Sequence, residues 1–364
     1  MSSTFGKAIK VTLFGESHGE CVGACIEGLA PGLKVDMDYM KAELAKRSAR
    51  GSISTQRREA DEPQIVSGIL NGYTEGTPLT ILIKNSSADR SAYAAMDHIA
   101  RPSHADFTAQ AKYLGFQDAA GGGHFSGRLT APLVAVCSIV RRALEEKDIF
   151  IGTHINRLHD ISDRAFAKDP AADIKALSAE YFPVLDPEAA QRMKSAIEKA
   201  GAAGDSLGGV LETAVTGLDA GIGEPWFDSV ESELAHALFS IPAVKGVEFG
   251  AGFAITELLG SQANDPLGIK DGRIVTLTNN SGGINGGITN GMPVVFRTAV
   301  KPTASIAAKQ QTVDFIKGET AEIQIAGRHD PAIVHRARAV VDSLTALVIA
   351  DLYARRYGYM WLRG

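Results

Sequence analysis

The chain has 364 residues, of which 45% are hydrophobic and 22% charged, a composition typical of a globular protein with a large apolar core. Its formal net charge of −5 argues against a general nucleic-acid or membrane-surface binder, so a local cluster of cations becomes more informative. The N-terminus lacks the pattern of a signal peptide, and no apolar run reaches the ~18 residues of a membrane span. We therefore expect a soluble, cytoplasmic protein.

The N-terminal half combines short strands with helices. The side-chain pattern predicts a strand over residues 9–14, a turn over 15–19 and a second strand that ends at residue 26. It then predicts a helix over 36–48, strands over 65–70 and 79–84, and a helix over 132–146. Asp36 is the expected N-cap of the first helix. Asn71-Gly72 predicts a tight hairpin turn, because this pair supplies the positive φ angles that such a turn needs.

The C-terminal half begins with a segment rich in Ala, Asp and Lys, from about residue 160 to 203, which predicts peripheral helices and loops. After it, the pattern predicts a strand over 209–215, a helix over 228–238, strands over 244–249, 253–258, 274–278, 293–299 and 322–325, and a final helix over 331–353. Strands and helices lack the steady βαβ rhythm of a Rossmann fold. The sequence therefore favours a mixed α+β sandwich.

The three cysteines, Cys21, Cys25 and Cys137, are too few for a disulfide framework, which fits a reducing compartment. No second cluster of cysteine or histidine completes a zinc ligand set beside Cys21 and Cys25. We expect three small buried side chains and no metal site.

Three short segments set an ionisable side chain beside a glycine or proline: Gly15–Gly19 with His18, Arg101–Asp106 with His104, and Arg328–Pro331 with Asp330. Histidine titrates near neutral pH, so two histidines in rigid turns and a carboxylate in a third predict proton transfer on a bound substrate. Two alternatives stay open. Some of the nine histidines must fall near a glycine by chance, and spacing alone favours Asp330 as the N-cap of the last helix.

A run of cations between Ala45 and Glu59 contains no acidic residue. Its members are Lys46, Arg47, Arg50, Arg57 and Arg58. Arginine suits carboxylate and phosphate groups, so the run predicts a compact anionic substrate, although a solvated face is the alternative. Two glycine runs, 121–123 and 281–291, are weak signals of close backbone approach to a ligand, and Lys301–Ser305 suits a phosphate or an electron-rich ring.

These motifs resemble, in order and spacing, those of the chorismate synthase family. The segments that carry the resemblance are 15–19, 56–59, 101–106, 121–123, 281–291, 301–303 and 328–331. It extends from about Phe5 to the end of the final helix and implies one domain, residues 1–364. It also implies a β-α-β sandwich with internal pseudo-symmetry and a homotetramer.

The resemblance implies a lyase of the shikimate pathway, which supplies aromatic amino acid biosynthesis. The reaction is the 1,4-anti elimination of phosphate from 5-enolpyruvylshikimate 3-phosphate to give chorismate, and it requires reduced FMN (FMNH2) although it is redox-neutral. We find no appended reductase domain, so we expect an external flavin reductant and no start of the reaction with NADPH alone.

By the same resemblance, His18 would protonate the departing phosphate, His104 would protonate or stabilise the reduced flavin, and Asp330 would assist proton removal with Ser17 as a relay. Arg47, Arg50, Arg57 and Arg128 are the expected substrate-binding residues. Flavin contacts are expected at His124, Phe125, Ser126, Pro242, Ala243, Ser281, Gly282, Lys301, Pro302, Thr303, Ala304, Ser305 and Arg328.

Two positions depart from the family pattern. His124 stands where many members carry an arginine, and the chain is one residue shorter around Ser48–Ser52, so Arg50 substitutes for the family's second arginine there. Two other classes compete with the synthase: a non-catalytic flavin- or phosphate-binding homologue, and a hydrolase that pairs Asp106 or Asp330 with a histidine.

Overall fold

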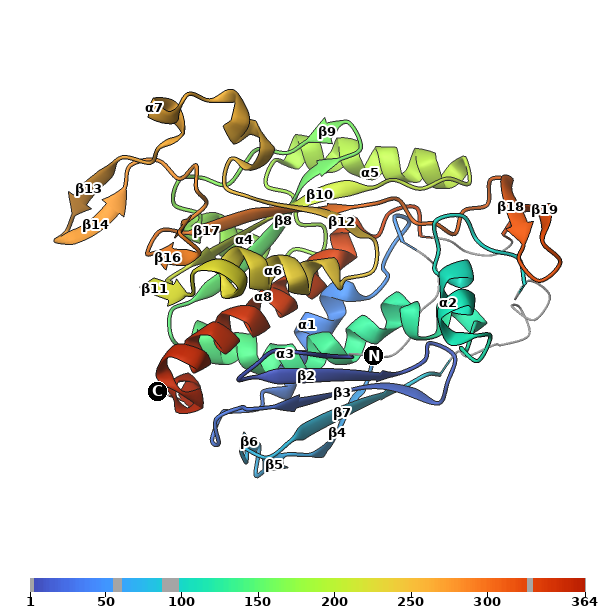
Figure 1. Cartoon of the computed structure of the whole chain (residues 1–364), viewed down its shortest axis with the longest axis horizontal. Coiled ribbons are helices and arrows are strands. Elements are labelled where there is room, and N and C mark those ends of the chain that lie inside the picture. The colour runs from blue at the N-terminus through green and yellow to red at the C-terminus, as the bar shows by residue number, and fades with distance from the viewer. Residues whose placement is uncertain (1–2, 55–60, 87–97, 326–329, 364) are drawn as a thin grey trace.

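Two five-stranded sheets face each other across a layer of helices (Figure 1). The computed structural model describes residues 3–54, 61–86, 98–325 and 330–363. The first sheet has the order β1 (Thr4–Phe5), β2 (Lys10–Gly15), β3 (Cys21–Glu27), β7 (Leu79–Lys84), β4 (Pro63–Ser67). The second has the order β12 (Val244–Phe249), β17 (Val294–Val300), β10 (Gly209–Thr216), β8 (Phe150–Leu158), β9 (Ile161–Ser162). The named strands of both sheets pair antiparallel.

The layer between the sheets consists of α1 (Met37–Arg47), α3 (Thr130–Glu145) and α8 (Val334–Tyr357). Helix α3 packs on β3 and β7, α8 packs on β8 and β10, and the two helices contact each other. Both are buried along most of their length because they have neighbours on every side. The predicted β-α-β sandwich is therefore confirmed, with one five-stranded sheet on each side of the layer.

Smaller elements surround the sandwich. The remaining α-helices are α2 (Asp106–Tyr113), α4 (Ala171–Leu177), α5 (Pro187–Ala202), α6 (Val230–Phe239) and α7 (Gly260–Ala263). The short sheets contain β5 (Ile69–Leu70), β6 (Tyr73–Thr74), β11 (Ala220–Gly223), β13 (Leu267–Lys270), β14 (Arg273–Thr276), β15 (Ile284–Asn285), β16 (Ile288–Asn290), β18 (Gln310–Asp314) and β19 (Glu319–Ile323). The described residues also form the 3-10 helices η1 (Ala120–Phe125), η2 (Gly127–Leu129), η3 (Trp226–Asp228), η4 (Gly252–Glu257) and η5 (Tyr359–Arg363).

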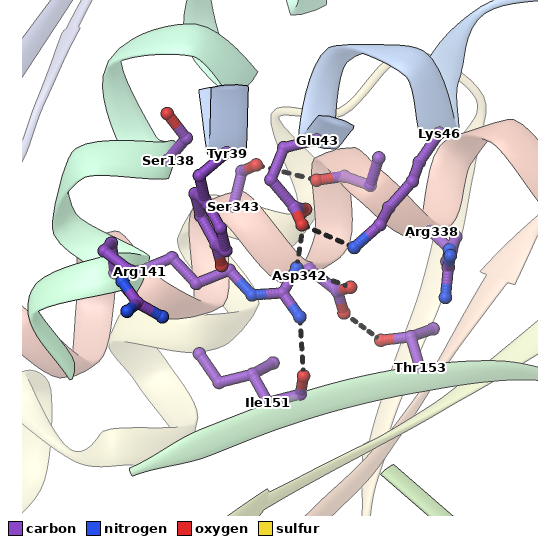
Figure 2. A network of polar contacts seen from close by, with 12 residues as sticks. Tyr39, Glu43, Lys46, Ser138, Arg141, Ile151, Thr153, Arg338, Asp342 and Ser343 are labelled. Atoms are coloured by element: carbon purple, nitrogen blue, oxygen red, sulfur yellow. Dashed lines mark hydrogen bonds and ion pairs between the residues drawn. The ribbon is translucent and has the colours of Figure 1, made fainter. Parts of the chain in front are cut away.

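A buried polar network ties the three central helices to the second sheet (Figure 2). Arg141 of α3 donates to Glu43 of α1 at 2.8 Å and to Asp342 of α8 at 3.1 Å. Asp342 also accepts the hydroxyl of Thr153 on β8 at 2.6 Å. Burial opposes the charge on Arg141, but the two carboxylates outweigh it and raise the pKa of the guanidinium. The network fixes α1, whose last residue is Arg47.

The structure confirms most predicted elements and corrects three. Asp36 caps α1 as expected, with its carboxylate accepting the N–H groups of Asp38 and Tyr39. The predicted strand 253–258 is wrong, because residues 252–257 form the 3-10 helix η4. Asn71-Gly72 does form a turn with positive φ, but it joins β5 to β6, while β4 pairs directly with β7. The N-cap prediction for Asp330 is also wrong, because Ile333 occupies that position in α8.

Candidate active site

The triple glycine of η1 packs against both predicted catalytic histidines. A Cβ atom added to Gly121 would lie 2.0 Å from Cε1 of His18, and one added to Gly122 would lie 3.2 Å from Cε1 of His104. Both glycines have positive φ, +60° and +91°. Two segments 86 positions apart in the sequence, around His18 and around His104, therefore meet at adjacent residues of one glycine run.

His18 lies in the turn between β2 and β3 and is buried. The Ser17 hydroxyl donates to the carbonyl of Ala120 at 3.2 Å and lies 2.9 Å from Nδ1 of His18. A hydroxyl has one proton, so Nδ1 is the donor in the bond between Ser17 and His18. Ser17 therefore fixes the orientation of the His18 ring against η1.

Arg101, His104 and Asp106 form a compact charged cluster at the start of α2. Nδ1 of His104 lies 2.7 Å from Asp106, and Arg101 donates to both oxygens of the same carboxylate at 2.7 and 2.8 Å. Burial opposes ionisation of Asp106, but hydrogen bonds from Arg101 and His104 outweigh it and hold the pKa of the carboxyl well below its ordinary value. An ionised Asp106 accepts a hydrogen bond from Nδ1–H of His104, and the Cε1–Nε2 edge of the ring lies beside Gly122.

Two of the predicted substrate-binding arginines are buried and share a carboxylate. Arg47 and Arg128 each pair with one oxygen of Asp61. Arg47 also donates to Thr130 at 3.2 Å and to the carbonyl of Gly127 at 3.3 Å. Burial lowers the pKa of Arg47 to about 10, so its side chain is still cationic at neutral pH. Two cations against one anion leave this cluster with a net positive charge.

Asp330 is linked to Arg47 through Arg336, a residue of the first turn of α8. Arg336 donates to the Asp330 carboxylate at 2.6 Å and to the backbone carbonyl of Arg47 at 2.7 Å. The predicted carboxylate and the predicted anion-binding arginine thus share a neighbour, although they lie 283 positions apart in the sequence.

The Lys301–Ser305 loop follows β17 and reaches the cluster around His104. The Lys301 amide donates to the carbonyl of Ala243 at 2.9 Å, which joins two of the segments predicted to contact flavin. Ser305 accepts from Arg101 at 3.5 Å. Burial lowers the pKa of Lys301, and the nearby Lys245 adds to the effect. Within the described ranges, no carboxylate pairs with Lys301.

Other predicted flavin contacts lie elsewhere or serve local structure. Ser281 and Gly282 lie at the opposite end of β17 from Lys301, about 20 Å away along the strand. His124 bonds the carbonyl of Gly15 through Nδ1 at 3.0 Å, and Ser126 caps η2 by accepting the amide of Arg128. Phe125 packs edge-on against Tyr113.

Two predicted residues, Arg57 and Arg328, lie outside the described residues. Sequence reasoning missed Asp61 and Arg336, which hold the predicted arginines and Asp330 in place. Asp61 carried a weak signal, because it lies three residues after Arg58, the last cation of the run. Arg336 carried none, since its bond to the Arg47 carbonyl forms only when α8 packs beside α1. Among the described residues, no group of three histidine, cysteine or acidic side chains is arranged to hold a metal ion.

Two histidines packed on one glycine run, together with a carboxylate that Arg336 links to a cation cluster, are the arrangement of an acid–base enzyme that acts on small anionic substrates. Comparison with known proteins identifies the family. The family model described as chorismate synthase matches residues 9–354, and the chain belongs to the chorismate synthase family. It is thus a carbon–oxygen lyase of the shikimate pathway, within aromatic amino acid biosynthesis, and its family is flavin-dependent.

Relatives and a solved structure agree with the family model. A chorismate synthase of Thermococcus gammatolerans is 47% identical over 96% of this chain and 97% of its own length. One from Dehalococcoides mccartyi is 45% identical over 98% of this chain and 97% of its own length. A crystal structure of chorismate synthase superposes with a TM-score of 0.77 at 26% identity, covering 97% of this chain and 94% of that one. Within the described residues, none of the helices has the length and hydropathy of a membrane span.

Proposed function

We propose that the enzyme converts 5-enolpyruvylshikimate 3-phosphate to chorismate by 1,4-anti elimination, with reduced FMN bound beside the Lys301–Ser305 loop. The electron pair of the broken C–H bond forms one double bond, and the existing ring double bond shifts toward the carbon that carries the phosphate. The C–O bond then breaks, and its electron pair leaves with the phosphate oxygen. The observation that carries this proposal is the contact of Gly121 with His18 and of Gly122 with His104, which sets two acid–base groups on one rigid segment.

The residues beside Lys301 fit a flavin mononucleotide. The hydroxyl of Thr303 is buried without a hydrogen-bond partner in the described part of the chain, and Lys301 is a half-buried cation without a carboxylate. Both features suit a ligand that brings an anionic group and hydrogen-bonding atoms. Reduced FMN, when bound, supplies transient electron donation that weakens the C–O bond of the substrate. The remaining flavin contacts assigned from the family pattern stay part of this proposal.

The acid–base roles follow from which nitrogen each histidine has available. His18, oriented by Ser17, gives a proton to the departing phosphate. His104, whose Nδ1 is engaged by Asp106, presents Nε2 to the reduced flavin, which it would protonate or stabilise. Asp330 assists removal of the ring proton, with Ser17 as a relay, and the bond from Arg336 keeps its carboxylate in place.

The cation cluster binds the phosphate and carboxylates of the substrate. Arg47 and Arg128 provide a net positive, water-poor wall, since one Asp61 neutralises only one of them. Arg50 and Arg57, from the same cation run, complete the substrate site in this proposal. In a poorly hydrated pocket, the cationic side chains stabilise the negative charge of the departing phosphate more strongly than the same charges would in water.

We also propose that residues 1–364 act as one domain, that the chain assembles as a homotetramer in the cytoplasm, and that an external reductant supplies the reduced flavin. The first of these is supported by the contributions of both sheets and of α8 to the site. Light scattering at micromolar concentration measures the assembly, and a monomer would contradict the tetramer.

Flavin binding tests the proposed function against the other two classes. Titration of FMN in the presence of substrate should quench flavin fluorescence with one site per chain, and phosphate release should follow when the flavin is reduced. Binding without phosphate release would favour a non-catalytic homologue. Phosphate release that is indifferent to FMN would favour a hydrolase.

A further inference from the structure

The loop that follows α1, residues 48–54 and here named the arginine loop, is held by a side chain from the segment between α4 and α5. The hydroxyl of Tyr181 accepts the backbone N–H of Arg50 at 2.9 Å and donates to the carbonyl of Ser48 at 3.0 Å. It also lies 3.1 Å from the hydroxyl of Ser54. One phenol therefore contacts the beginning, the middle and the end of the arginine loop.

His335 extends this contact into the core. Its Nε2 lies 2.9 Å from the Ser54 hydroxyl, and its ring is fully buried against the rings of Tyr181 and Phe182. One arrangement of protons fits the three shorter bonds: His335 Nε2 donates to Ser54, Ser54 donates to Tyr181, and Tyr181 donates to Ser48. The Tyr181 hydroxyl also lies 3.4 Å from Nε2 of His335. The chain of donors runs outward from α8 to the arginine loop.

Tyr181 also orients the Arg50 side chain. The guanidinium carbon of Arg50 lies 5.2 Å from the centre of the Tyr181 ring, within the range of a cation–π interaction. Arg50 is exposed, so without this contact its long side chain would sample many rotamers. The tyrosine thus fixes both the backbone and the side chain of Arg50.

The beginning of the arginine loop has a second anchor. Arg336, the neighbour of His335 in α8, donates to the backbone carbonyl of Arg47 at 2.7 Å. His335 and Arg336, which are consecutive residues of α8, therefore anchor the two ends of the arginine loop to the buried helix, while Tyr181 contacts the same loop from the segment between α4 and α5. None of these bonds uses the guanidinium donors of Arg50, which are left for a ligand.

We propose that Tyr181 is a positioning residue for substrate binding, which fixes the arginine loop so that Arg50 meets the anionic substrate in a single geometry. This inference rests on the proposed function, in which Arg47 and Arg50 bind the phosphorylated substrate. Tyr181 acts through Arg50, so its loss affects the KM for the substrate more than kcat.

The test is Tyr181→Phe, which removes the hydroxyl and keeps the ring. In the free enzyme, amide hydrogen exchange of residues 48–54 should accelerate about tenfold or more, because the Arg50 N–H loses its acceptor. The KM for 5-enolpyruvylshikimate 3-phosphate should rise about tenfold, the equivalent of one hydrogen bond, while kcat changes less than about threefold. Ser54→Ala, which breaks the link to His335, should move both quantities in the same direction.

Tyr353→Phe is the matched control. The Tyr353 hydroxyl also accepts a backbone N–H, that of Asp219, at 2.9 Å, and it lies about 27 Å from His335 along α8. The Tyr353→Phe variant should lower the melting temperature without changing the KM for the substrate or the amide hydrogen exchange of residues 48–54. An unchanged KM in Tyr181→Phe, or an equal rise in Tyr353→Phe, would overturn the proposal. Turnover of the unmodified enzyme, measured in parallel, tests the proposed function separately.

Discussion

At the scale of single residues, the space left by glycine decides where the two histidines lie. A methyl group at position 121 would overlap the ring of His18, since its Cβ would lie 2.0 Å from Cε1 and 2.2 Å from Nδ1. Gly122 is less tight, with its nearest contact at 3.2 Å from His104. The glycine run is therefore part of the proposed catalytic geometry, beyond its role in turning the chain toward α3.

Gly121→Ala should reduce kcat about as much as His18→Ala does, by roughly 10²- to 10⁴-fold, because the added methyl group displaces the acid from its position. Steady-state kinetics of both variants and of Gly260→Ala measure this effect. Gly260 has no neighbour within 4 Å of an added Cβ, so its variant should keep normal turnover. Normal turnover in Gly121→Ala would contradict the assigned contact.

Asp330→Asn separates proton transfer from helix capping. The carboxylate does not cap α8 and its pairing with Arg336 is partly exposed, so the variant should lose at most about 1 kcal/mol of unfolding free energy. Turnover should fall roughly 10²- to 10⁴-fold, because an amide cannot accept the ring proton. Urea unfolding and kinetics check the two effects, and unchanged turnover would remove Asp330 from the catalytic residues.

At the scale of elements, the first turn of α8 combines a buried neutral histidine with the arginine that holds Asp330. Burial, together with the neighbouring charge of Arg336, lowers the pKa of His335 to about 3. The unfolded chain, with a histidine pKa near 6.5, binds the proton more readily than the folded chain. Stability from this residue is therefore complete above about pH 6.5 and is lost as the pH falls below that value.

His335→Gln should flatten the acid side of the stability profile. At pH 5 the buried histidine costs the unmodified enzyme about 2 kcal/mol of unfolding free energy relative to pH 7, and the glutamine variant lacks this loss. Urea unfolding at pH 5, 6 and 7 measures the difference between the two proteins. Parallel profiles for both would show that His335 does not titrate as described.

Local patterns predicted the elements that carry their own signal and missed those that depend on distant partners. Asp36 and the periodic apolar residues of α3 were sufficient to place two helices. Strand β8 was missed because it contains Gly, His, Asn and Arg, and its His154 is stabilised by Asp163 and Glu212 from other segments. Residues 253–258 alternate like a strand, but Glu248 accepts the Phe253 amide and the positive φ of Gly252 starts a 3-10 turn.

At the scale of the whole molecule, the site draws on both halves of the sandwich. The first sheet supplies His18, the second supplies the Lys301–Ser305 loop, and α8 in the central layer supplies Arg336. The sequence motifs predicted which residues matter through a family resemblance, and spacing alone could not show that they meet. The segment of residues 160–203, which the sequence predicted as peripheral, also contributes to the proposed site, because the Tyr181 hydroxyl accepts the Arg50 amide of the arginine loop. Such contacts arise only when the layers pack.

We propose that the enzyme uses reduced FMN as a catalyst for a redox-neutral elimination. Substrate and product have the same overall oxidation level, so the flavin must regain its electron in every cycle. Under anaerobic conditions, one pre-reduced FMN per chain should support many turnovers, with phosphate and chorismate formed in equal amounts and no steady consumption of reductant. Stoichiometric loss of reduced flavin per product, or full activity with oxidised FMN, would contradict the account.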